Sequence, residues 1–530
     1  MSRALPDGRR RAGGNNGAVT ASPDDPLRPA APAPRRLGDL AGAFALSPAG
    51  PGEGWACVEV TGVSADNRLV RGGELFAAHA GAHVHGARFV PAAVAAGARA
   101  VLTDPAGAEL LAAADPGVPV LVTPDVPALL GRLAADLYGH PGRALGTFAV
   151  TGTNGKTTTA FMVDHALRSL GRRTGLIGTV EVRVGDRAVP ATLTTPQPAD
   201  LQALLAAMVA DGVDDLVMEV SSHALALGRV DPLVYDVAGF TNLTADHLDF
   251  HGDLEGYYAA KASLFDISRT GVVVADDRWG RRLAAETGDA VAALTTGPGG
   301  DWTVTGVEAD ATGSAFTLAH RDGRSLRTRT DLPGAFNVAN AALAAAMVLT
   351  SGVAPAELED ALAGAGGLSP QVPGRMEQLG DRPRVVVDFA HNTDALVQAL
   401  AALRPTTTGR LHVVIGAAGD RDRAKRPEMG RAAVDGADTV IVTDDDPHDE
   451  PAAQIRAEVL AGTTGAAVRE IADRAEAIRT AVLEAADDDT VLVAGRGHET
   501  VQEVAGVDHH LDDREEVRAA LALRAGGQHA

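Results

Sequence analysis

The sequence predicts an α/β protein of about three domains that are built mainly on parallel sheets. Strand-like apolar runs alternate with alanine-rich helical runs from about residue 37 to the C-terminus, and this alternation is typical of α/β folds. A length of 530 residues allows roughly three domains at about 150 residues each. Gly/Pro-rich stretches at 140–146 and 364–374 indicate where the domains meet. We expect a disordered arm at residues 1–36 and domains at residues 37–145, 146–370 and 371–530.

The expected sheets can be traced strand by strand. Loops with Gly, Asp or His follow most of the apolar runs, and ligands of open parallel sheets bind beyond the carboxyl ends of the strands. The expected strands of the central domain are Thr147–Val150, Leu216–Val220, Val237–Thr241 and Val272–Ala275. Those of the last domain are Arg384–Phe389, Leu411–Ile415, Thr439–Thr443 and Thr490–Ala494. An alanine-rich helix is expected at Val338–Val353.

Composition and charge limit the kinds of partner. Apolar residues make up 45% of the chain and charged residues 22%, as in folded globular proteins. The formal net charge of -22 argues against a general attraction to nucleic acid or to an anionic membrane surface. A phosphate ligand would therefore have to be held by a local site.

Three features favour the cytoplasm. The single cysteine, Cys57, cannot form an internal disulfide, and we interpret it as a small buried apolar residue. The first 36 residues contain no continuous apolar run that could serve as a signal peptide. The most apolar later stretch, residues 338–353, is shorter than the ~20 residues needed to cross a bilayer. We expect a cytoplasmic protein without a membrane span.

The strongest local signal is TGTNGKTT at residues 151–158, between an expected strand and a helix that should run to about Leu170. Glycines let backbone amides approach phosphate oxygens, Lys156 reaches terminal phosphates and the Thr157 hydroxyl can bind a metal ion. The general phosphate-loop spacing would require glycine where Val150 stands, so the match is to a variant. A glycine-rich turn without a ligand is the weaker alternative. The expected nucleotide contacts here are Gly152, Thr153, Asn154, Gly155, Lys156, Thr157 and Thr158.

Two further polar residues follow strands that should neighbour this loop. Glu219 ends the second central strand, and His247 follows the third. Neighbouring parallel strands would deliver both side chains to one cleft. Magnesium prefers oxygen ligands, so Glu219 with Thr157 is a sensible pair and His247 a less typical partner. In isolation, a capping role for Glu219 and an ordinary loop role for His247 are the more common interpretations.

Seven further strings stand in the order in which the Mur ligases that make the muramyl tripeptide carry them. They are MEVSSHALALGRV, FTNLTADHLDFHG, GAFNVAN, PGRMEQ, VVVDFAH, GDRDRAKRP and AGRGHE. The loop TGTNGKTT also resembles the Mur ligase form of the phosphate loop. The chain therefore resembles the Mur ligase family from about Ser64 to Arg514.

The resemblance implies a three-domain architecture with a central P-loop-type parallel sheet and a C-terminal Rossmann-like domain. It also implies ATP and Mg²⁺ as cofactors. In such enzymes ATP phosphorylates a substrate carboxylate, and the amino group of an incoming amino acid attacks the acyl phosphate. The expected acceptor is UDP-N-acetylmuramoyl-L-alanyl-D-glutamate, and the expected third residue is meso-diaminopimelate. The domains should close on the substrates.

Site residues follow from the resemblance position by position. The implied catalytic residues are Lys156, Glu219, His247 and Lys261, and the implied metal ligands are Thr157, Glu219, His247 and a carbamylated Lys261. Further ATP contacts are Asn337, Arg375, Asp388 and His391. Contacts to the UDP-sugar peptide are Asn67, Thr194, Thr195, Ser221 and Arg229. Contacts to the added amino acid are Arg421, Asp445, Asp446, Pro447, His448, Gly495 and Glu499.

Two of the motifs expected to contact substrates depart from the family pattern. Asn67 stands where the family has serine, and Asp445-Asp446-Pro447-His448 stands where diaminopimelate-adding members have Asp-Asn-Pro-Arg. Loss of a bidentate arginine should weaken binding of the distal carboxylate. The alternatives are therefore L-lysine or another diamino acid as the nucleophile, or a paralogue that makes a different peptide. A folylpolyglutamate-type ligase and a non-catalytic nucleotide-binding protein are weaker alternatives. The oligomeric state stays open, with a monomer as the default.

Overall fold

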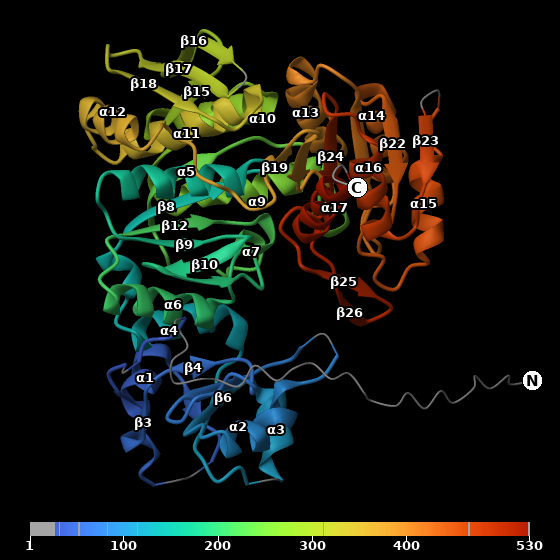
Figure 1. Ribbon diagram of the computed structural model, residues 1–530. Coiled ribbons are helices and arrows are strands. Elements are labelled where there is room, and N and C mark those ends of the chain that lie inside the picture. Colours follow the sequence, from blue (N-terminus) through green and yellow to red (C-terminus); the bar gives the residue numbers. More distant parts are fainter. Residues whose placement is uncertain are drawn as a thin grey trace, which may run out of the picture.

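The computed structural model describes residues 27–30, 32–50, 53–81, 83–113, 115–310, 312–464 and 467–527. Three sheet-bearing regions follow one another along the chain (Figure 1). The first region lies below the central one in Figure 1, and the last region lies beside the central one. The fold is the α/β architecture that the sequence predicts.

The first region is a small five-stranded sheet with helices packed on it. Its strand order is β2-β7-β6-β5-β4, and β4, β5, β6 and β7 run parallel. The strands are β2 (Ser47–Pro48), β4 (Val63–Ser64), β5 (Leu75–Ala78), β6 (Ala100–Thr103) and β7 (Val120–Val122), with β1 (Arg35–Arg36) paired to β3 (Glu59–Val60). The helices are α1 (Leu37–Phe44), α2 (Val90–Ala95), α3 (Pro105–Ala112) and α4 (Val126–Leu137).

The segment expected to be a disordered arm is partly built into the fold. Residues 1–26 lie outside the described residues. Arg35 and Arg36 form strand β1, and Arg28 pairs with two carboxylates. The prediction of an arm through residue 36 is therefore wrong for the described residues between 27 and 36. The prediction failed because the carboxylate partners of this arginine-rich segment lie far along the chain.

The central region holds an eleven-stranded sheet in the order β11-β10-β9-β12-β8-β13-β14-β15-β16-β17-β18. The seven strands from β9 to β16 in this spatial order (β9, β12, β8, β13, β14, β15 and β16) run parallel. The strands at both ends of the sheet are antiparallel. The parallel strands are β9 (Thr174–Ile177), β12 (Asp215–Glu219), β8 (Gly146–Thr151), β13 (Tyr235–Phe240), β14 (Ser268–Val274), β15 (Val291–Thr295) and β16 (Trp302–Asp310). The ends are formed by β10 (Glu181–Val184), β11 (Arg187–Pro190), β17 (Gly313–His320) and β18 (Ser325–Thr330).

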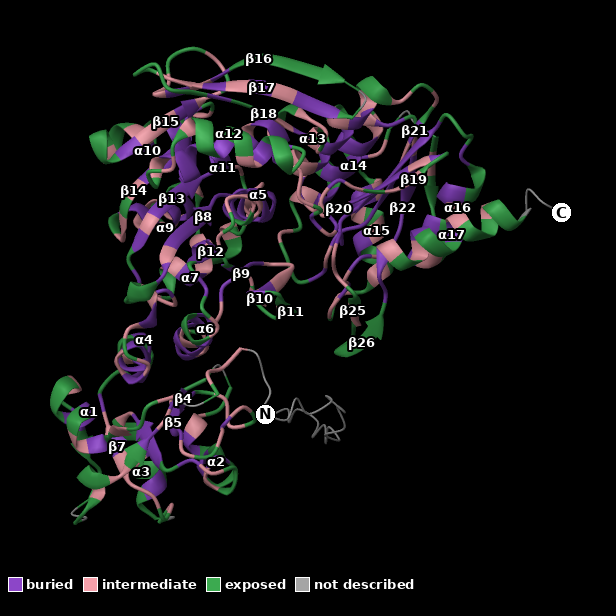
Figure 2. Cartoon of the chain, turned by 60° about the vertical axis from the view of Figure 1, so that its left-hand side comes forward, coloured by how far each residue is buried: buried purple, intermediate pink, exposed green. Residues whose placement is uncertain are grey.

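Helices cover both faces of this sheet and leave its middle strands buried (Figure 2). The alanine-rich helix α11 (Ala335–Thr350) packs beside α5 (Lys156–Ser169), where its small side chains allow close approach. The other face is covered mainly by α6 (Pro198–Ala210), α9 (Leu254–Asp266) and α10 (Arg278–Thr287). The remaining helices are α7 (Ser222–Ala226), α8 (Leu248–His251) and α12 (Pro355–Gly364).

The last region is a six-stranded sheet in the order β19-β20-β24-β21-β22-β23, parallel except at β19. Its strands are β19 (Glu377–Asp381), β20 (Arg384–Asp388), β21 (Leu411–Ile415), β22 (Thr439–Val442), β23 (Ala467–Glu470) and β24 (Thr490–Ala494). Its helices are α13 (Thr393–Leu403), α14 (Lys425–Gly436), α15 (Ala452–Leu460), α16 (Arg474–Glu484) and α17 (Asp513–Gly527). A separate hairpin joins β25 (Val501–Val504) to β26 (Val507–His510).

All eight strands predicted for the two larger sheets are present, within a few residues of the expected bounds. The alanine-rich helix is present as well, beginning three residues earlier than predicted. Cys57 is exposed, so its interpretation as a buried apolar residue is wrong. Among the described residues, no helix combines the length and the apolar character needed to cross a membrane.

Candidate active site

The phosphate-loop motif connects β8 to the first turn of α5. Gly152 and Gly155 have φ angles of 145° and 86°, a region that residues with a Cβ rarely adopt. A Cβ on Gly152 would also overlap the hydroxyl of Thr241, which follows β13. The amide of Thr153 donates to the carbonyl of Asn242 at 2.9 Å. The loop is therefore held against the end of the neighbouring strand, with α5 beginning at Lys156.

Glu219 lies at the carboxyl end of β12, directly beside this loop. Its side chain is fully buried, and its Oε2 accepts from the Thr157 hydroxyl at 3.0 Å. Thr179 donates its amide to Oε1 at 2.8 Å and its hydroxyl to Oε2 at 3.0 Å. In the described part of the chain no cationic side chain forms an ion pair with this carboxylate. A buried anion held by neutral donors is a position that a cation would stabilise.

Two lysines meet on one carbonyl of the phosphate loop. Lys156 Nζ and Lys261 Nζ donate to Gly152 O at 3.0 Å and 2.6 Å. Lys261 projects from α9 and is buried, with its amine 4.4 Å from the centre of the Tyr257 ring. Burial and the charge of Lys156 hold the pKa of Lys261 well below its usual value. The arrangement therefore favours a neutral amine at Lys261.

His247 lies on the rim of this cluster. Its backbone is left-handed, with φ at 52°, and its side chain is 45% exposed. The ring meets His223 edge to face at 5.0 Å between centroids and lies 6.3 Å from Tyr257. Burial and the nearby positive charge of Lys156 lower the pKa of His247 to about 4. The imidazole is therefore neutral and available as a ligand, although no described hydrogen bond joins it to Glu219.

The last region reaches across to the phosphate loop. Arg375 Nη2 lies 3.5 Å from the Thr157 hydroxyl, and its guanidinium lies 4.3 Å from the centre of the Phe389 ring. Asn154 donates to Asp394 at 3.0 Å and accepts from Asn392 at 3.1 Å. These contacts make the loop part of an interdomain site.

The other expected ATP contacts surround the same loop. Asn337, in the first turn of α11, is buried and accepts from Asn340 at 3.2 Å. His391 Nε2 lies 3.8 Å from Asp246. Asp388 accepts from the Met376 amide at 2.7 Å, and burial raises its pKa against the opposing charge of Arg375. All of these residues belong to one interdomain site.

Two cavities open from this site. The smaller, of about 120 Å³, is lined by the phosphate loop, Asn337, Arg375, Asp388 and His391. The larger, of about 1200 Å³, lies between the β16–β18 edge of the central sheet and the last region. Both are lined by Phe336, Arg375, Met376 and Gln398, so they adjoin at these residues. Together they extend from the phosphate loop to the β16–β18 edge of the central sheet.

Four of the five expected contacts to the UDP-sugar peptide lie next to Glu219. The Thr194 hydroxyl lies 3.1 Å from that of Thr179, and the Thr195 hydroxyl donates to Glu219 O at 2.9 Å. The Ser221 amide donates to Thr195 at 3.1 Å, and Arg229 Nη1 to Thr195 O at 3.4 Å. Asn67 follows β4 in the first region, and no described contact joins it to this group.

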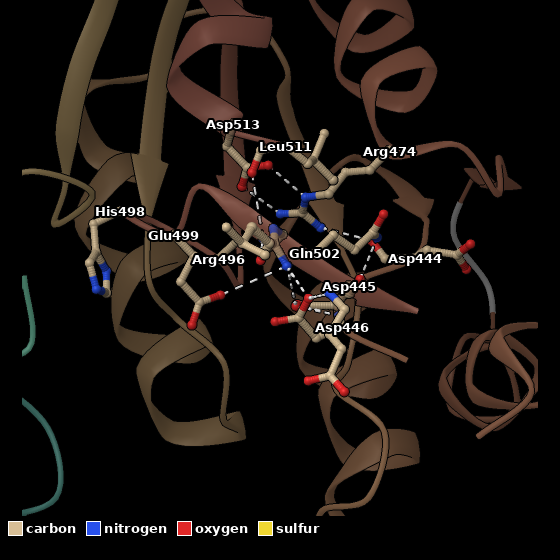
Figure 3. Close-up of polar contacts among 12 residues, drawn as sticks. Asp444, Asp445, Asp446, Arg474, Arg496, His498, Glu499, Gln502, Leu511 and Asp513 are labelled. Atoms are coloured by element: carbon tan, nitrogen blue, oxygen red, sulfur yellow. Dashed lines mark hydrogen bonds and ion pairs between the residues drawn. The ribbon is translucent and has the colours of Figure 1, made fainter. Parts of the chain in front are cut away.

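A second charged cluster follows the carboxyl ends of β22 and β24 in the sequence. Figure 3 shows its side chains. One carboxylate oxygen each from Asp445, Asp446 and Glu499 lies within 4.8 Å of the others. The fully buried Arg496 donates to Asp446 at 2.7 Å and lies 3.8 Å from Glu499. Burial, together with the charges of Asp445 and Asp446, raises the pKa of Glu499 to about 8. Gly495 lets the Asp445 carboxylate lie close to the backbone, because a Cβ at Gly495 would be 2.6 Å from a carboxylate oxygen of Asp445.

Two arginines of this cluster were missed by sequence reasoning. Arg496 lies within the AGRGHE string, which was itself a signal, whereas Arg474 comes from α16 with no motif around it. Arg474 pairs with Asp513 at 2.7 Å in full burial, and it donates to the carbonyl of Ala494. This buried pair fixes the end of β24 beneath the carboxylates.

Pro447, His448 and Arg421 lie around the cluster rather than in it. The Gly419 amide donates to Asp446 O at 2.7 Å, which sets the loop of Arg421 against Pro447. Arg421 itself is exposed, and among the described residues it forms no hydrogen bond or ion pair. His448 turns toward the β25–β26 hairpin, where Nδ1 lies 3.1 Å from Glu503 Oε2. Glu503 is the partner that sequence reasoning did not find.

Family models match three consecutive stretches of the chain. The Mur ligase family, catalytic domain, matches residues 59–138, and the Mur ligase middle domain matches residues 150–348. The glutamate ligase domain of the Mur ligases matches residues 374–497.

Similar proteins cover most of the chain. A UDP-N-acetylmuramoyl-L-alanyl-D-glutamate--2,6-diaminopimelate ligase of Streptomyces coelicolor is 47% identical over 88% of this chain and 94% of its own length. A UDP-N-acetylmuramyl-tripeptide synthetase of Leifsonia xyli is 44% identical over 94% of this chain and 98% of its own length.

Solved structures agree with these relatives. That of a UDP-N-acetylmuramoyl-L-alanyl-D-glutamate--2,6-diaminopimelate ligase is 32% identical, with a TM-score of 0.61 over 94% of this chain and all of the other. A MurF ligase from Thermotoga maritima in complex with ADP shares the fold at 18% identity, with a TM-score of 0.62 over 88% of this chain and 98% of its own. The chain therefore belongs to the Mur ligase family of ATP-dependent ligases.

Proposed function

We propose that this enzyme adds the third amino acid, meso-diaminopimelate, to UDP-N-acetylmuramoyl-L-alanyl-D-glutamate during peptidoglycan synthesis. The observation that carries the proposal is the shared position of Glu219. One oxygen of its carboxylate accepts from both Thr157 of the phosphate loop and Thr179, which contacts Thr194 beside the expected acceptor site. The phosphate donor and the carboxylate that receives the phosphate are thus expected to meet at one buried group. The names of the relatives support the choice of substrates.

The reaction needs its anions held close together. A carboxylate oxygen of the D-glutamate residue attacks the γ-phosphorus of ATP, the bond to ADP breaks, and an acyl phosphate forms. The free amine of the third amino acid then attacks the acyl carbon, phosphate leaves, and the nitrogen loses a proton. Lys156 and Arg375 are placed to balance charge at the transferred phosphate, and Arg229 at the acceptor peptide.

The residues present fit magnesium. Glu219 supplies a fully buried carboxylate without an ionic partner among the described residues, and Thr157 supplies a hydroxyl. Oxygen donors of this kind suit Mg²⁺, and His247 with a neutral ring stands nearby. Bound magnesium would neutralise phosphate charge in this pocket. We assign Thr157, Glu219, His247 and Lys261 as the groups around it.

Lys261 fits carbamylation. A neutral amine can add to carbon dioxide and release a proton, which leaves an N-carboxylate in place of the cation. Burial and the charge of Lys156 lower the pKa of Lys261, which increases the fraction of the neutral amine that can react. The product would place an anionic group beside the ammonium of Lys156 at Gly152 O and would add oxygen donors for a metal ion.

We assign the three regions separate ligands. Residues 37–145, with Asn67, would hold the uridine end, and residues 146–370 would hold the dipeptide and the phosphates of ATP. Residues 371–530 would hold the added amino acid at Asp445, Asp446 and Glu499, whose carboxylates suit an ammonium group. We place the reaction in the cytoplasm, where ATP and nucleotide-linked sugars are both present.

A second candidate nucleophile, L-lysine, is favoured by one specific contact. The Glu503 carboxylate lies 3.1 Å from Nδ1 of His448, so an acidic group stands beside the position where diaminopimelate-adding members carry arginine. A carboxylate attracts an ammonium and repels another carboxylate. This dyad therefore suits the terminal ammonium that lysine and diaminopimelate share, whereas an arginine would select the carboxylate of diaminopimelate.

Product analysis tests both candidates. Purified enzyme with ATP, magnesium and UDP-N-acetylmuramoyl-L-alanyl-D-glutamate is given meso-diaminopimelate, LL-diaminopimelate, lysine or ornithine, and products are identified by mass. Turnover with meso-diaminopimelate above the other three supports the leading proposal. Turnover with lysine or ornithine supports the second, and His448→Arg should then shift kcat/KM toward diaminopimelate by about tenfold. No product with any of the four would overturn both.

A further inference from the structure

A buried arginine precedes the first sheet of the protein. Arg28 lies upstream of residue 59, where the first family model begins to match. Its side chain is only 7% exposed, and Nη1 and Nη2 donate to Glu74 Oε1 at 2.7 Å and to Asp200 Oδ1 at 3.0 Å. A guanidinium presents its donors in a rigid planar fork, so this one side chain fixes the separation of two carboxylates.

The two carboxylates belong to different regions of the molecule. Glu74 precedes β5 in the first region, and its second oxygen accepts from the Arg71 amide at 2.8 Å. Asp200 lies in the first turn of α6 in the central region, five residues after Thr195. Arg28 therefore joins the turn before β5 to the helix that follows the expected dipeptide contacts.

The described part of this junction also contains apolar contacts. Helices α4 and α6 pack against each other where the two regions meet (Figure 2). Ala199 of α6 lies in the core of the first region, and Gly131 of α4 approaches the backbone of Asp231. Apolar packing of this kind has little directional preference. The fork of Arg28 supplies a directional contact that apolar packing lacks.

The charge of Arg28 is retained in this site. Burial by itself would lower the pKa of the guanidinium, but the carboxylates of Glu74 and Asp200 outweigh burial and raise it. The Glu74 side chain is 6% exposed, and among the described residues Arg28 is its ion-pair partner, so removal of Arg28 would leave this buried carboxylate less well compensated. Arg28 therefore contributes to the charge balance of the junction.

We propose that Arg28 is a positioning residue that fixes the first region against the central region, so that both ends of one UDP-sugar peptide bind at once. The inference rests on the proposed function, in which the uridine end and the dipeptide lie on different regions. A ligand that spans two sites gains affinity from both only if their separation matches its length. A looser junction would lower the fraction of molecules with the matching separation.

Kinetics of Arg28→Gln test this role against a matched control. Arg36 lies in the same segment and pairs with Glu59 at 3.9 Å, with both side chains more than half exposed, so Arg36→Gln makes the same charge change without the junction. In Arg28→Gln we expect KM for the UDP-sugar dipeptide to rise about tenfold, with kcat and the KM for ATP within about twofold. In Arg28→Lys the KM for the UDP-sugar dipeptide should lie between those of the wild type and Arg28→Gln, because an ammonium keeps the charge but lacks the planar pair of donors. An equal rise in every KM, or no rise in any, would overturn the proposal.

A distance measurement tests the junction without any substrate. Cys57 is exposed and is the single cysteine, and Ala210→Cys on the exposed end of α6 provides a second labelling site in the central region. Spin labels on this pair should give one narrow distance distribution, which Arg28→Gln broadens and Arg36→Gln does not. An unchanged distribution in Arg28→Gln overturns the inference. If Arg28→Gln broadens the distance distribution but the wild-type enzyme makes no tripeptide, the role of Arg28 at the junction would stand and the proposed function would be rejected.

Discussion

Glu219 is a carboxylate whose burial has a high electrostatic cost. It is fully buried, and its oxygens accept only from the hydroxyl groups of Thr157 and Thr179 and from the Thr179 amide among the described contacts. A carboxylate in this setting costs folding free energy unless a cation compensates it. We therefore propose that the residue serves ligand binding rather than stability.

Glu219→Gln should separate these two roles. Because the amide keeps the shape and loses the charge, we expect thermal stability to be unchanged or higher while the ligase rate falls by about 100-fold or more. Thermal unfolding and phosphate release measure the two effects. Glu255→Gln, at an exposed position of α9, serves as the control and should change neither. A lower melting temperature with full activity would contradict the assignment.

Glu499 provides a pH-dependent signature. Its pKa is raised from 4.5 to about 8 by burial and by Asp445 and Asp446, so the folded state binds a proton that the unfolded state releases. The associated stability is fully present below the unfolded pKa and is lost as pH rises through about 8. We expect the free energy of unfolding to fall between about pH 5 and pH 9 more steeply in the wild type than in Glu499→Gln. Denaturant titrations measure the slope, and the exposed Glu484→Gln should keep the wild-type slope.

At the scale of elements, the packing of α11 against the central sheet positions two asparagines beside the phosphate loop. Its buried alanines let it lie close to α5 and the central sheet, and its first turns carry Asn337 and Asn340 to the phosphate loop. A Cβ on Gly155 would lie 2.5 Å from Asn340 Oδ1, which shows how closely the helix approaches the loop. The small side chains of the helix therefore bring Asn340 close to the phosphate loop.

Ala344→Leu tests this packing. Ala344 is fully buried in α11, so the larger side chain should overpack the core and cost about 1–3 kcal/mol of unfolding free energy. Ala363→Leu, on the exposed side of α12, should have little effect. Chemical denaturation measures both, and equal stabilities of the two variants would contradict the close packing.

At the scale of the whole molecule, the site is shared between the central region and the last region. Arg375 contacts Thr157, and His498 Nε2 lies 3.1 Å from the carbonyl of Thr179, so the last region covers the phosphate loop. Substrates must nevertheless enter between these regions. We expect the free enzyme to sample more open arrangements, and both substrates together to favour the closed one.

Solution scattering measures this closure. The radius of gyration should decrease when a non-hydrolysable ATP analogue and the UDP-sugar dipeptide are added together. Arg375→Ala should weaken the decrease, because it removes the contact to Thr157. Arg404→Ala, at an exposed ion pair with Asp438, should leave the decrease unchanged. An identical radius with and without both substrates would reject the prediction.

The sequence by itself determined the fold class, the strands of the two larger sheets and the family. Buried parallel strands appear as apolar runs in the sequence, and the glycine, lysine and threonine residues of the phosphate loop stand next to one another along the chain. Tertiary structure decided the partners: Arg28 with Glu74 and Asp200, Arg474 with Asp513, and His448 with Glu503. These pairs join residues far apart along the chain, and their charges match only after the elements pack. Local pattern therefore predicts the elements, whereas long-range packing selects which charged groups meet.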